Sequence, residues 1–225
     1  MPQGSILGPL LFLIYVNDIN NAVTEEFPRL FADDTNLFLE SPDYQTLQIK
    51  VNRVCKHLEE WLLANRLSLN ITKTNYLLFK PKNFKSNIPT DFQFRFFGTV
   101  IQEVSSSKYL GVFIDNECSW IVHIDYVYDN LMKFCGLFYR IRDIIPEDCA
   151  RTLYFSFVHT RLLYGLEVYG SACATHLNKL MKLNNKILRI ILHKPFRSPT
   201  IDLYNYFNIL LLTLQHDLLL VKLFH

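Results

Sequence analysis

The order of apolar and polar residues changes near residues 117–120. Before this point, short apolar runs alternate with turn residues, and 92–96 places aromatic side chains at every second position, as is typical of a strand. After it, apolar residues recur every three or four positions, as they do in amphipathic helices. We therefore expect an α+β chain with a mixed domain over residues 1–118 and a helical domain over residues 119–225.

The first domain is expected to contain two helices. The apolar run 10–17 predicts a short helix whose first position Pro9 can occupy. Ser41-Pro42-Asp43 predicts the start of a longer helix, with Ser41 as its cap and Pro42 at its first position. The apolar residues that follow at helical spacing are Leu47, Val51, Val54, Leu58, Trp61 and Leu62.

Short strands are expected in the rest of this domain. Residues 29–39 hold two apolar runs around Asp33 and Asp34, a pattern typical of a β-hairpin with the acids at its turn. A single strand is predicted over 76–79. Further strands over 92–96, 100–101 and 109–114 are expected to form a small antiparallel hairpin system, in which 105–107 is a turn.

Three helices are expected at the start of the second domain. Apolar spacing predicts the first over 120–141, and Pro146 begins the second. The third covers about 176–192, and its inward-facing residues are Leu180, Leu183, Ile187 and Ile191.

The candidate chemistry of the first domain lies in Asp33 and Asp34. Two neighbouring carboxylates repel each other, and in a half-buried site they require a cation or a proton. Mg²⁺ suits such a pair, since it binds one or two carboxylates together with substrate phosphates. An ordinary surface turn is the alternative, because Asp is a favoured turn residue, and the two residues alone leave both interpretations open.

The distribution of charge is more informative than its total. The formal net charge is only +2, but residues 1–119 hold 11 Lys/Arg against 13 Asp/Glu, whereas residues 120–225 hold 12 against 8. No acid occurs between Glu167 and Asp202. The third helix carries a basic stripe of Lys179, Lys182, Lys186 and Arg189. This stripe either contacts a phosphate backbone or is a solvent-facing surface that happens to lack acids.

Several protein classes are disfavoured by composition. Five cysteines with no C-x-x-C pair argue against a disulfide framework or a zinc site, and favour an intracellular protein over a secreted one. The apolar run 10–16 lacks the basic flank and cleavage pattern of a signal peptide. The Leu-rich run near the C-terminus is interrupted by polar residues too soon for a membrane span.

Five short motifs follow one another along the chain. The first two are Pro2-Gln3-Gly4-Ser5-Ile6-Leu7-Gly8-Pro9 and Phe31-Ala32-Asp33-Asp34, and the third is Lys73-Thr74. The last two are Tyr109-Leu110-Gly111-Val112, followed by Asp115, Trp120, His123 and Ile124, and Leu163-Tyr164-Gly165 ahead of the basic helix. In this order they resemble the reverse transcriptases of non-LTR (LINE-type, jockey-like) retrotransposons. The resemblance extends from residue 2 nearly to residue 225.

The resemblance implies a right-hand polymerase cut through its palm. Residues 1–118 would be a partial palm with the catalytic and primer-grip hairpins, and 119–225 an all-helical thumb truncated at its C-terminus. Asp33 would ligate the Mg²⁺ ions, with Mn²⁺ as a possible substitute, while Asp34 would be the accessory acid and Lys73 a general acid near the triphosphate.

The resemblance also implies the partners, which are an RNA template, a DNA primer and a dNTP. Gln3, Gly4 and Ser5 would shape the nucleotide and template pocket. Tyr109, Leu110 and Gly111 would hold the primer terminus. The duplex backbone would lie along Lys179, Lys182, Lys186 and Arg189.

The chain departs from the family at its start. Family members carry fingers and another palm strand with a metal-binding Asp before the first motif, and here Met1 stands directly before Pro2. We therefore expect a fragment of an RNA-directed DNA polymerase that is inactive unless the missing part is supplied elsewhere. The alternatives are a non-catalytic remnant that binds nucleic acid and an apolar remnant that interacts or aggregates.

Overall fold

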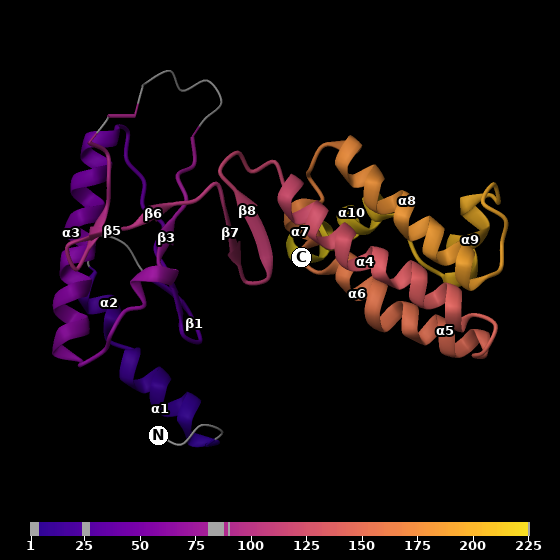
Figure 1. Ribbon diagram of the computed structural model, residues 1–225, viewed down its shortest axis with the longest axis horizontal. Helices are drawn as coiled ribbons and strands as arrows, with labels where there is room; N and C mark the ends of the chain where they lie inside the picture. Colours follow the sequence, from indigo (N-terminus) through magenta and orange to yellow (C-terminus); the bar gives the residue numbers. More distant parts are fainter. Residues whose placement is uncertain (1–4, 24–27, 81–87, 90, 225) are drawn as a thin grey trace. The chain divides into compact units, whose positions relative to one another are not determined.

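The computed structural model describes every residue except 1–4, 24–27, 81–87, 90 and 225. The described residues form helices and small two-stranded sheets, in agreement with the predicted α+β class (Figure 1). They fall into two compact units. The N-terminal unit comprises Met1–Leu78 and Asn83–Val104, and the C-terminal unit comprises Phe79–Lys82 and Ser105–His225.

The boundary between these units differs from the predicted boundary at 118/119. The segment from Ser105 onward clusters with the helices, so the hairpin that follows it packs with the C-terminal unit. The division into palm and thumb is a separate, functional assignment, and it stays a prediction.

The N-terminal unit is built around one long helix. In chain order its elements are α1 (Leu7–Val16), α2 (Ile19–Ala22), β1 (Arg29–Phe31), β2 (Asp34–Asn36), α3 (Tyr44–Ala64), the 3₁₀ turn η1 (Ile71–Lys73), β3 (Asn75–Tyr76), β4 (Arg95–Phe96), β5 (Thr99–Val100) and β6 (Gln102–Glu103). Val54 and Leu58 of α3 are buried in one core with Phe94, Phe96 and Ile101. The apolar stripe predicted for this helix therefore faces the core, as expected.

Both predicted helix starts in this unit are shifted. Helix α1 begins at Leu7, so Pro9 is its third residue; proline is tolerated there because the N–H groups of the first turn have no partner within the helix. The cap of α3 is Asp43, not Ser41. The Asp43 carboxylate accepts hydrogen bonds from the Thr46 N–H at 2.8 Å and the Thr46 hydroxyl at 2.7 Å, and the first of these bonds lowers the pKa of Asp43.

The strands of this unit are shorter than predicted. Within the longer predicted strands, only Tyr76 of β3 and Arg95–Phe96 of β4 pair with a neighbouring strand, and β3 lies parallel to β6, which was not predicted. The alternation over 92–96 still has a physical meaning, because Phe94 and Phe96 are buried and Phe94 makes edge-on ring contacts. Burial of alternate side chains therefore does not require a long ladder of backbone hydrogen bonds here.

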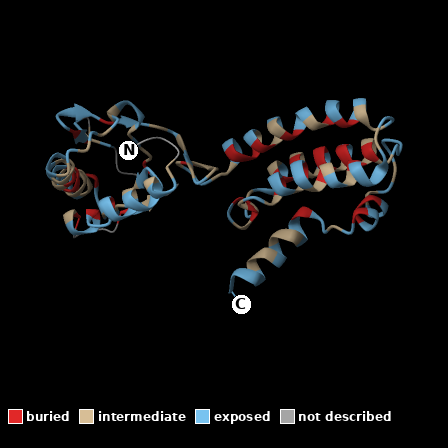
Figure 2. Ribbon diagram, turned by 90° about the horizontal axis from the view of Figure 1, so that it is seen from below, coloured by how far each residue is buried: buried red, intermediate tan, exposed pale blue. Residues whose placement is uncertain are grey.

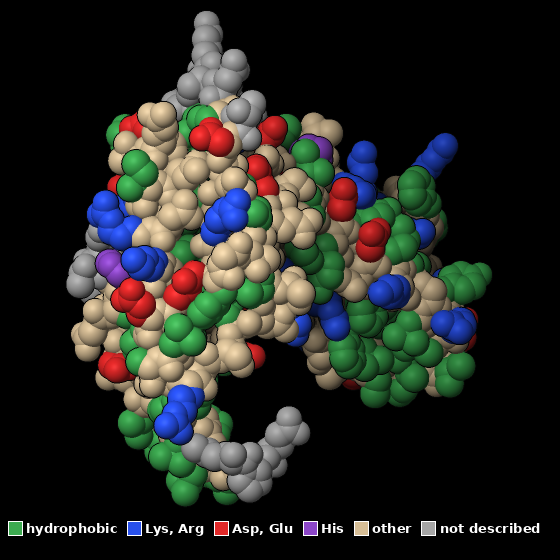
Figure 3. All heavy atoms as spheres, turned by 60° about the vertical axis from the view of Figure 1, so that its left-hand side comes forward, with side chains coloured by type: hydrophobic (Ala, Val, Ile, Leu, Met, Phe, Trp, Pro, Cys, Tyr) green, Lys and Arg blue, Asp and Glu red, His purple; other side chains and the backbone are tan. Residues whose placement is uncertain are grey.

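Helix α1 exposes most of its apolar surface. Its exposed residues are Leu7, Leu10, Leu11, Leu13, Ile14 and Tyr15, whereas Val16 is buried. Figure 3 shows hydrophobic side chains gathered over this end of the N-terminal unit. The Tyr15 hydroxyl donates to the carbonyl oxygen of Asn65, which ties the end of α1 to the end of α3.

The first regular element of the C-terminal unit is an antiparallel hairpin of β7 (Ser106–Tyr109) and β8 (Val112–Asp115), in which Tyr109 pairs with Val112. The predictions of a turn at 105–107 and an unbroken strand at 109–114 are therefore wrong. The chain reverses at Leu110 and Gly111, whose φ angles are 46° and 86°. Such a two-residue turn with positive φ at both positions matches the twist of the flanking strands.

Helices make up the rest of the C-terminal unit. They are α4 (Ile121–Ile141), α5 (Glu147–Leu153), the π-helical turn η2 (Tyr154–His159), α6 (Thr160–Leu163), α7 (Leu166–Tyr169), α8 (Ala174–Ile191), α9 (Thr200–Phe207) and α10 (Leu212–Phe224). Helices α4, α5 and α8 confirm the three predicted helices within a few residues. Figure 2 shows the buried residues on the sides of these helices that face one another.

The inner face of α8 is the one predicted from the sequence. Leu180, Leu183, Ile187 and Ile191 are all buried in the same core as Leu131 of α4. Within the described residues no single helix is long and apolar enough to cross a membrane; α9 and α10 meet that criterion only together, and they are bent by 42°.

Candidate nucleic-acid and metal site

Asp33 and Asp34 of the Phe31-Ala32-Asp33-Asp34 motif lie at the tip of the β1–β2 hairpin. Phe31 pairs with Asp34, so the turn between the strands consists of Ala32 and Asp33. Ala32 has a φ of 51°, a region that residues with a Cβ rarely adopt. The turn accounts for this conformation, because a positive φ at the first residue of a two-residue turn matches the twist of the flanking strands.

The Asp33 and Asp34 side chains are both exposed. The described residues contain no group of three His, Cys, Asp or Glu side chains that could hold a metal ion. Two carboxylates nevertheless fit Mg²⁺, which commonly takes one or two carboxylates and completes its shell with water and substrate phosphates. The role of the pair as metal ligands stays a prediction, and an ordinary surface turn stays the alternative.

The other predicted catalytic and nucleotide-binding residues are only partly described. Lys73 is exposed at the end of η1, and its backbone carbonyl accepts a 3.3 Å hydrogen bond from Asn75. Ser5 lies just before α1, where its carbonyl accepts a 3.2 Å hydrogen bond from the Gly8 N–H. Gln3 and Gly4 lie outside the described residues.

The predicted primer-binding residues form the tip of the β7–β8 hairpin. The Tyr164 hydroxyl donates a 2.6 Å hydrogen bond to the carbonyl oxygen of Leu110. A Cβ on Gly111 would lie 2.9 Å from Tyr164 Cε1, and a Cβ on Gly165 would lie 2.7 Å from Val112 Cγ2. The Tyr-Leu-Gly-Val and Leu-Tyr-Gly motifs, which were separate in the sequence, thus contact each other directly.

The opposite end of the hairpin is fixed to the start of α4. The Asp115 carboxylate accepts hydrogen bonds from the N–H groups of Ser119 and Trp120, both at 2.9 Å, and of Glu117 at 3.2 Å. Burial alone raises the pKa of Asp115, but these backbone hydrogen bonds outweigh it and leave the pKa below its usual value. Asp115 is therefore a structural cap for this junction.

His123 joins the hairpin to the first turn of α4. Its Nδ1 accepts a 3.3 Å hydrogen bond from the Phe113 N–H, and its ring packs edge-on against Tyr169. Burial lowers the pKa of His123 below 6.5. Because Nδ1 accepts this hydrogen bond, the neutral imidazole carries its proton on Nε2, which has no hydrogen-bond partner among the described residues.

Two side chains of the basic stripe of α8 make contacts within the protein, and the other two are exposed without an ion pair among the described residues. Lys179 forms a 2.6 Å ion pair with Asp125 of α4, and this hydrogen bond raises the pKa of Lys179. Arg189 donates to the Ser198 carbonyl at 3.0 Å. Lys182 and Lys186 are exposed, and neither has an ion pair with another described residue. The middle of the stripe is therefore the part available to a phosphate backbone.

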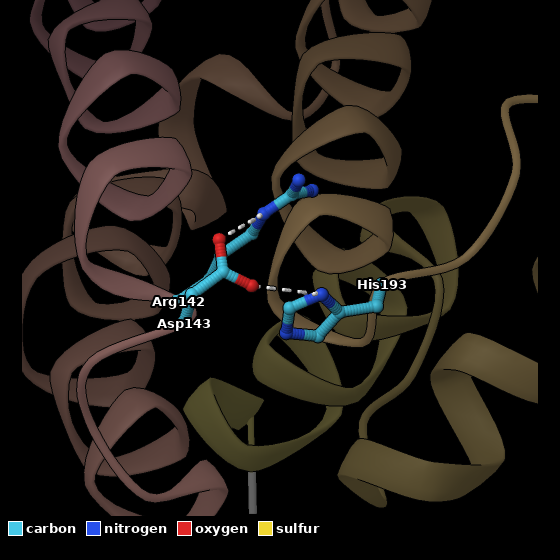
Figure 4. Close-up of polar contacts among 3 residues, drawn as sticks. All are labelled: Arg142, Asp143 and His193. Carbon is cyan, nitrogen blue, oxygen red and sulfur yellow. Dashed lines mark ion pairs between the residues drawn. The ribbon is translucent and has the colours of Figure 1, made fainter.

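The far ends of α4 and α8 are joined by a surface ion-pair cluster (Figure 4). Asp143 lies 3.5 Å from Arg142 Nε and 3.5 Å from His193 Nδ1. Since Asp143 is largely exposed, this cluster is expected to contribute less than about 1 kcal/mol to stability.

Sequence reasoning did not assign the roles of Tyr164 and Gly165 in holding the hairpin, or the ion pair of Lys179 with Asp125. The sequence signal for the contact that holds the hairpin was the presence of Gly111 and Gly165 in two of the motifs. Glycine is the residue that permits both a positive φ and a close backbone approach.

The motif order and the acid-bearing hairpin are features of nucleic-acid polymerases, and comparison with known proteins agrees. The family model described as "Reverse transcriptase (RNA-dependent DNA polymerase)" matches residues 1–114. The chain belongs to this family.

The curated relatives are non-LTR retrotransposon proteins, which confirms the resemblance inferred from the motifs. The RNA-directed DNA polymerase from mobile element jockey of Drosophila funebris is 28% identical over 213 residues, covering 90% of this chain and 23% of that protein. The probable RNA-directed DNA polymerase from transposon X-element of Drosophila melanogaster is 23% identical over 198 residues, covering 85% of this chain and 21% of that protein. The chain thus spans about a fifth of the length of these relatives. No solved structure matches it significantly.

Proposed function

We propose that this chain is the part of an RNA-directed DNA polymerase that carries the catalytic carboxylates and holds the primer–template duplex. Residues 1–118 would supply part of the palm, and 119–225 the thumb. The observation that carries the proposal is the coincidence of the family match over residues 1–114 with two exposed, adjacent carboxylates at a tight hairpin turn.

The reaction is nucleotidyl transfer. The primer 3′-hydroxyl attacks the α-phosphate of a dNTP, a new phosphodiester bond forms, and pyrophosphate leaves. Asp33 and Asp34 would hold the divalent ions, Mg²⁺ or Mn²⁺, that when bound lower the pKa of the attacking hydroxyl and stabilise the leaving oxygen. Lys73, exposed at the end of η1, would donate a proton to the pyrophosphate.

Duplex binding is assigned to the C-terminal unit. Lys182 and Lys186 project into solvent from the middle of α8 and would contact phosphates without reading sequence. The hairpin tip at Tyr109–Gly111 would hold the primer end. An RNA template paired with a DNA primer is thus the expected partner.

The 225-residue polypeptide is expected to bind a primer–template duplex without extending it. Its described residues offer two adjacent carboxylates and no third acid beside them. Binding to an RNA–DNA hybrid, followed by fluorescence anisotropy over a salt series, should weaken steeply as salt increases. Absence of binding at low salt would contradict the proposal.

Primer extension with Mg²⁺ or Mn²⁺ tests the expected inactivity of the isolated polypeptide. Template-dependent incorporation that disappears in Asp33→Ala would show that this segment is catalytically complete. Binding without incorporation fits both a polymerase segment and the non-catalytic nucleic-acid-binding alternative. These two differ in whether Asp33 and Asp34 bind a divalent ion.

An interaction or aggregating segment is the remaining alternative, and the exposed apolar surface of α1 favours it. A chain that is insoluble when expressed alone, or soluble without any affinity for the hybrid, would support this alternative.

A further inference from the structure

The turn of the β7–β8 hairpin and the α6–α7 junction fit together through two glycines. Gly111 has a φ of 86° and lies against the Tyr164 ring; Gly165 has a φ of 71° and lies against Val112. At both positions a Cβ would lie within 3 Å of a side-chain atom of the other segment. The two segments therefore approach more closely than any other residue would allow.

The Tyr164 hydroxyl adds a directional contact to this fit. It donates a 2.6 Å hydrogen bond to the carbonyl oxygen of Leu110, the first residue of the turn. Leu110 has a φ of 46°, which is unfavourable for a residue with a Cβ. A hydrogen bond to its carbonyl holds the Leu110–Gly111 peptide plane in the orientation that this strained turn requires.

Three further contacts leave the hairpin little freedom to move independently of the helices. The Phe113 N–H donates to His123 of α4, and Lys108 Nζ lies 5.4 Å from the centroid of the Tyr126 ring, also of α4. The Asp115 carboxylate caps the start of the same helix. Tyr164 is thus the attachment at the tip, whereas the other contacts fix the strands and the base of the hairpin.

The tip nevertheless remains accessible. Leu110 is 41% exposed and Tyr164 is 57% exposed. A ligand can therefore reach the turn that Tyr164 holds.

We propose that Tyr164 is a positioning residue for the 3′ end of a DNA primer paired with RNA. It acts through the Leu110–Gly111 turn, whose orientation it sets from the helical unit. The inference rests on the proposed function, because it takes the hairpin tip as the element that holds the primer end.

The conservative variant Tyr164→Phe separates this role from packing. It keeps the ring against Gly111 and removes only the hydroxyl that bonds to Leu110. The matched control is Tyr139→Phe: Tyr139 is similarly exposed, at 60%, and its ring packs on Arg142 at a distance from the hairpin.

The test compares two fluorescent RNA–DNA hybrids bound to the full 225-residue chain. One has a recessed DNA 3′ end on a longer RNA, and the other is a continuous hybrid whose ends are closed by loops. The wild-type chain should prefer the recessed end. In Tyr164→Phe this preference should fall about fivefold, the loss expected for one hydrogen bond, while affinity for the closed hybrid stays unchanged. Tyr139→Phe should behave as wild type.

The amide signal of Gly111 gives a second readout. Its nitrogen belongs to the peptide whose carbonyl accepts the Tyr164 hydrogen bond, so its ¹⁵N shift should change in Tyr164→Phe and not in Tyr139→Phe.

The possible failures are distinguishable. Tyr164→Phe that retains the preference for the recessed end, or that loses affinity for both hybrids equally, overturns the role of Tyr164 alone. A wild-type chain that binds neither hybrid overturns both this role and the proposed function.

Discussion

The Tyr164 hydroxyl bonds to the carbonyl oxygen of Leu110 at 2.6 Å, across 54 residues of sequence. This contact joins two motifs that the sequence assigns to different domains. Together with the contacts of the hairpin to α4, it accounts for the clustering of Ser106–Asp115 with the helices that follow. The predicted primer-holding turn is therefore positioned by the C-terminal unit.

The close fit of Gly111 against Tyr164 predicts that the loss of stability caused by a substitution at Gly111 depends on the side chain at position 164. Gly111→Ala should destabilise the C-terminal unit by about 3 kcal/mol, through both the positive φ and the contact with the ring. In a Tyr164→Ala background the same change should cost only about 1–2 kcal/mol, because only the backbone strain remains. Urea unfolding monitored by Trp120 fluorescence, in a Trp61→Phe chain, measures both values. Equal costs in the two backgrounds would contradict the described packing.

Gly136 predicts the opposite effect of an added methyl group. It lies within α4, it is exposed, and a Cβ there would meet no atom within 4 Å. Gly136→Ala should stabilise the C-terminal unit by about 0.5–1 kcal/mol, since alanine favours the helix. The same unfolding experiment measures this change. A loss of stability would contradict the open space described around Gly136.

The division of the α8 stripe predicts unequal roles for its lysines. Replacing both Lys182 and Lys186 by Gln should reduce the slope of log K against log salt for hybrid binding by about 1.4–1.8, the value for two lost phosphate contacts. Lys179→Gln should reduce it much less, because Lys179 is paired with Asp125. A larger effect from Lys179 than from the other two would place the duplex elsewhere on the helix.

The buried His123 predicts loss of stability in mild acid. Burial lowers its pKa below 6.5, so below that pH the unfolded chain takes up a proton that the folded chain resists. Stability of the C-terminal unit should therefore be constant above this range and fall as the pH drops through 6.5 toward the folded pKa. His159 is shifted in the same direction by burial, so part of the dependence should remain in His123→Gln.

His123→Gln provides the comparison, since a Gln side chain can accept the Phe113 N–H without titrating. Urea midpoints measured between pH 5 and 8 should show a shallower decline for this variant than for the wild type. An identical decline in the variant and the wild type would mean that His123 does not contribute to the loss of stability in acid.

Elements with long, regular periodicity could be predicted from the sequence. The inward residues of α8 and the acid-bearing turn of β1–β2 follow directly from spacing and turn chemistry. The Leu110–Gly111 turn could not be predicted from hydrophobicity, because apolar residues occupy both sides of it and Gly111 alone marks the reversal. The cap of α3 was misassigned because Ser41 and Asp43 are both good caps, and only the backbone position decides between them.

The remaining features could not be predicted because they depend on contacts between residues that are far apart in the sequence. Nothing in the local sequence of α8 shows that Asp125, 54 residues earlier, neutralises Lys179. Likewise, glycine is required at 165 by its φ of 71° and by the Val112 side chain, which belongs to a different element.

Divalent metal binding by the β1–β2 turn tests the central claim most directly. In ¹H–¹⁵N spectra of the 225-residue chain with a primer–template and a dNTP, Mn²⁺ should broaden the amide signals around Phe31–Thr35 selectively. The broadening should disappear in the Asp33→Asn/Asp34→Asn double variant and persist in Asp143→Asn, which neutralises an exposed acid of the C-terminal unit. Signals around the turn that stay sharp in the wild type, or broadening that survives the double variant, would contradict the account.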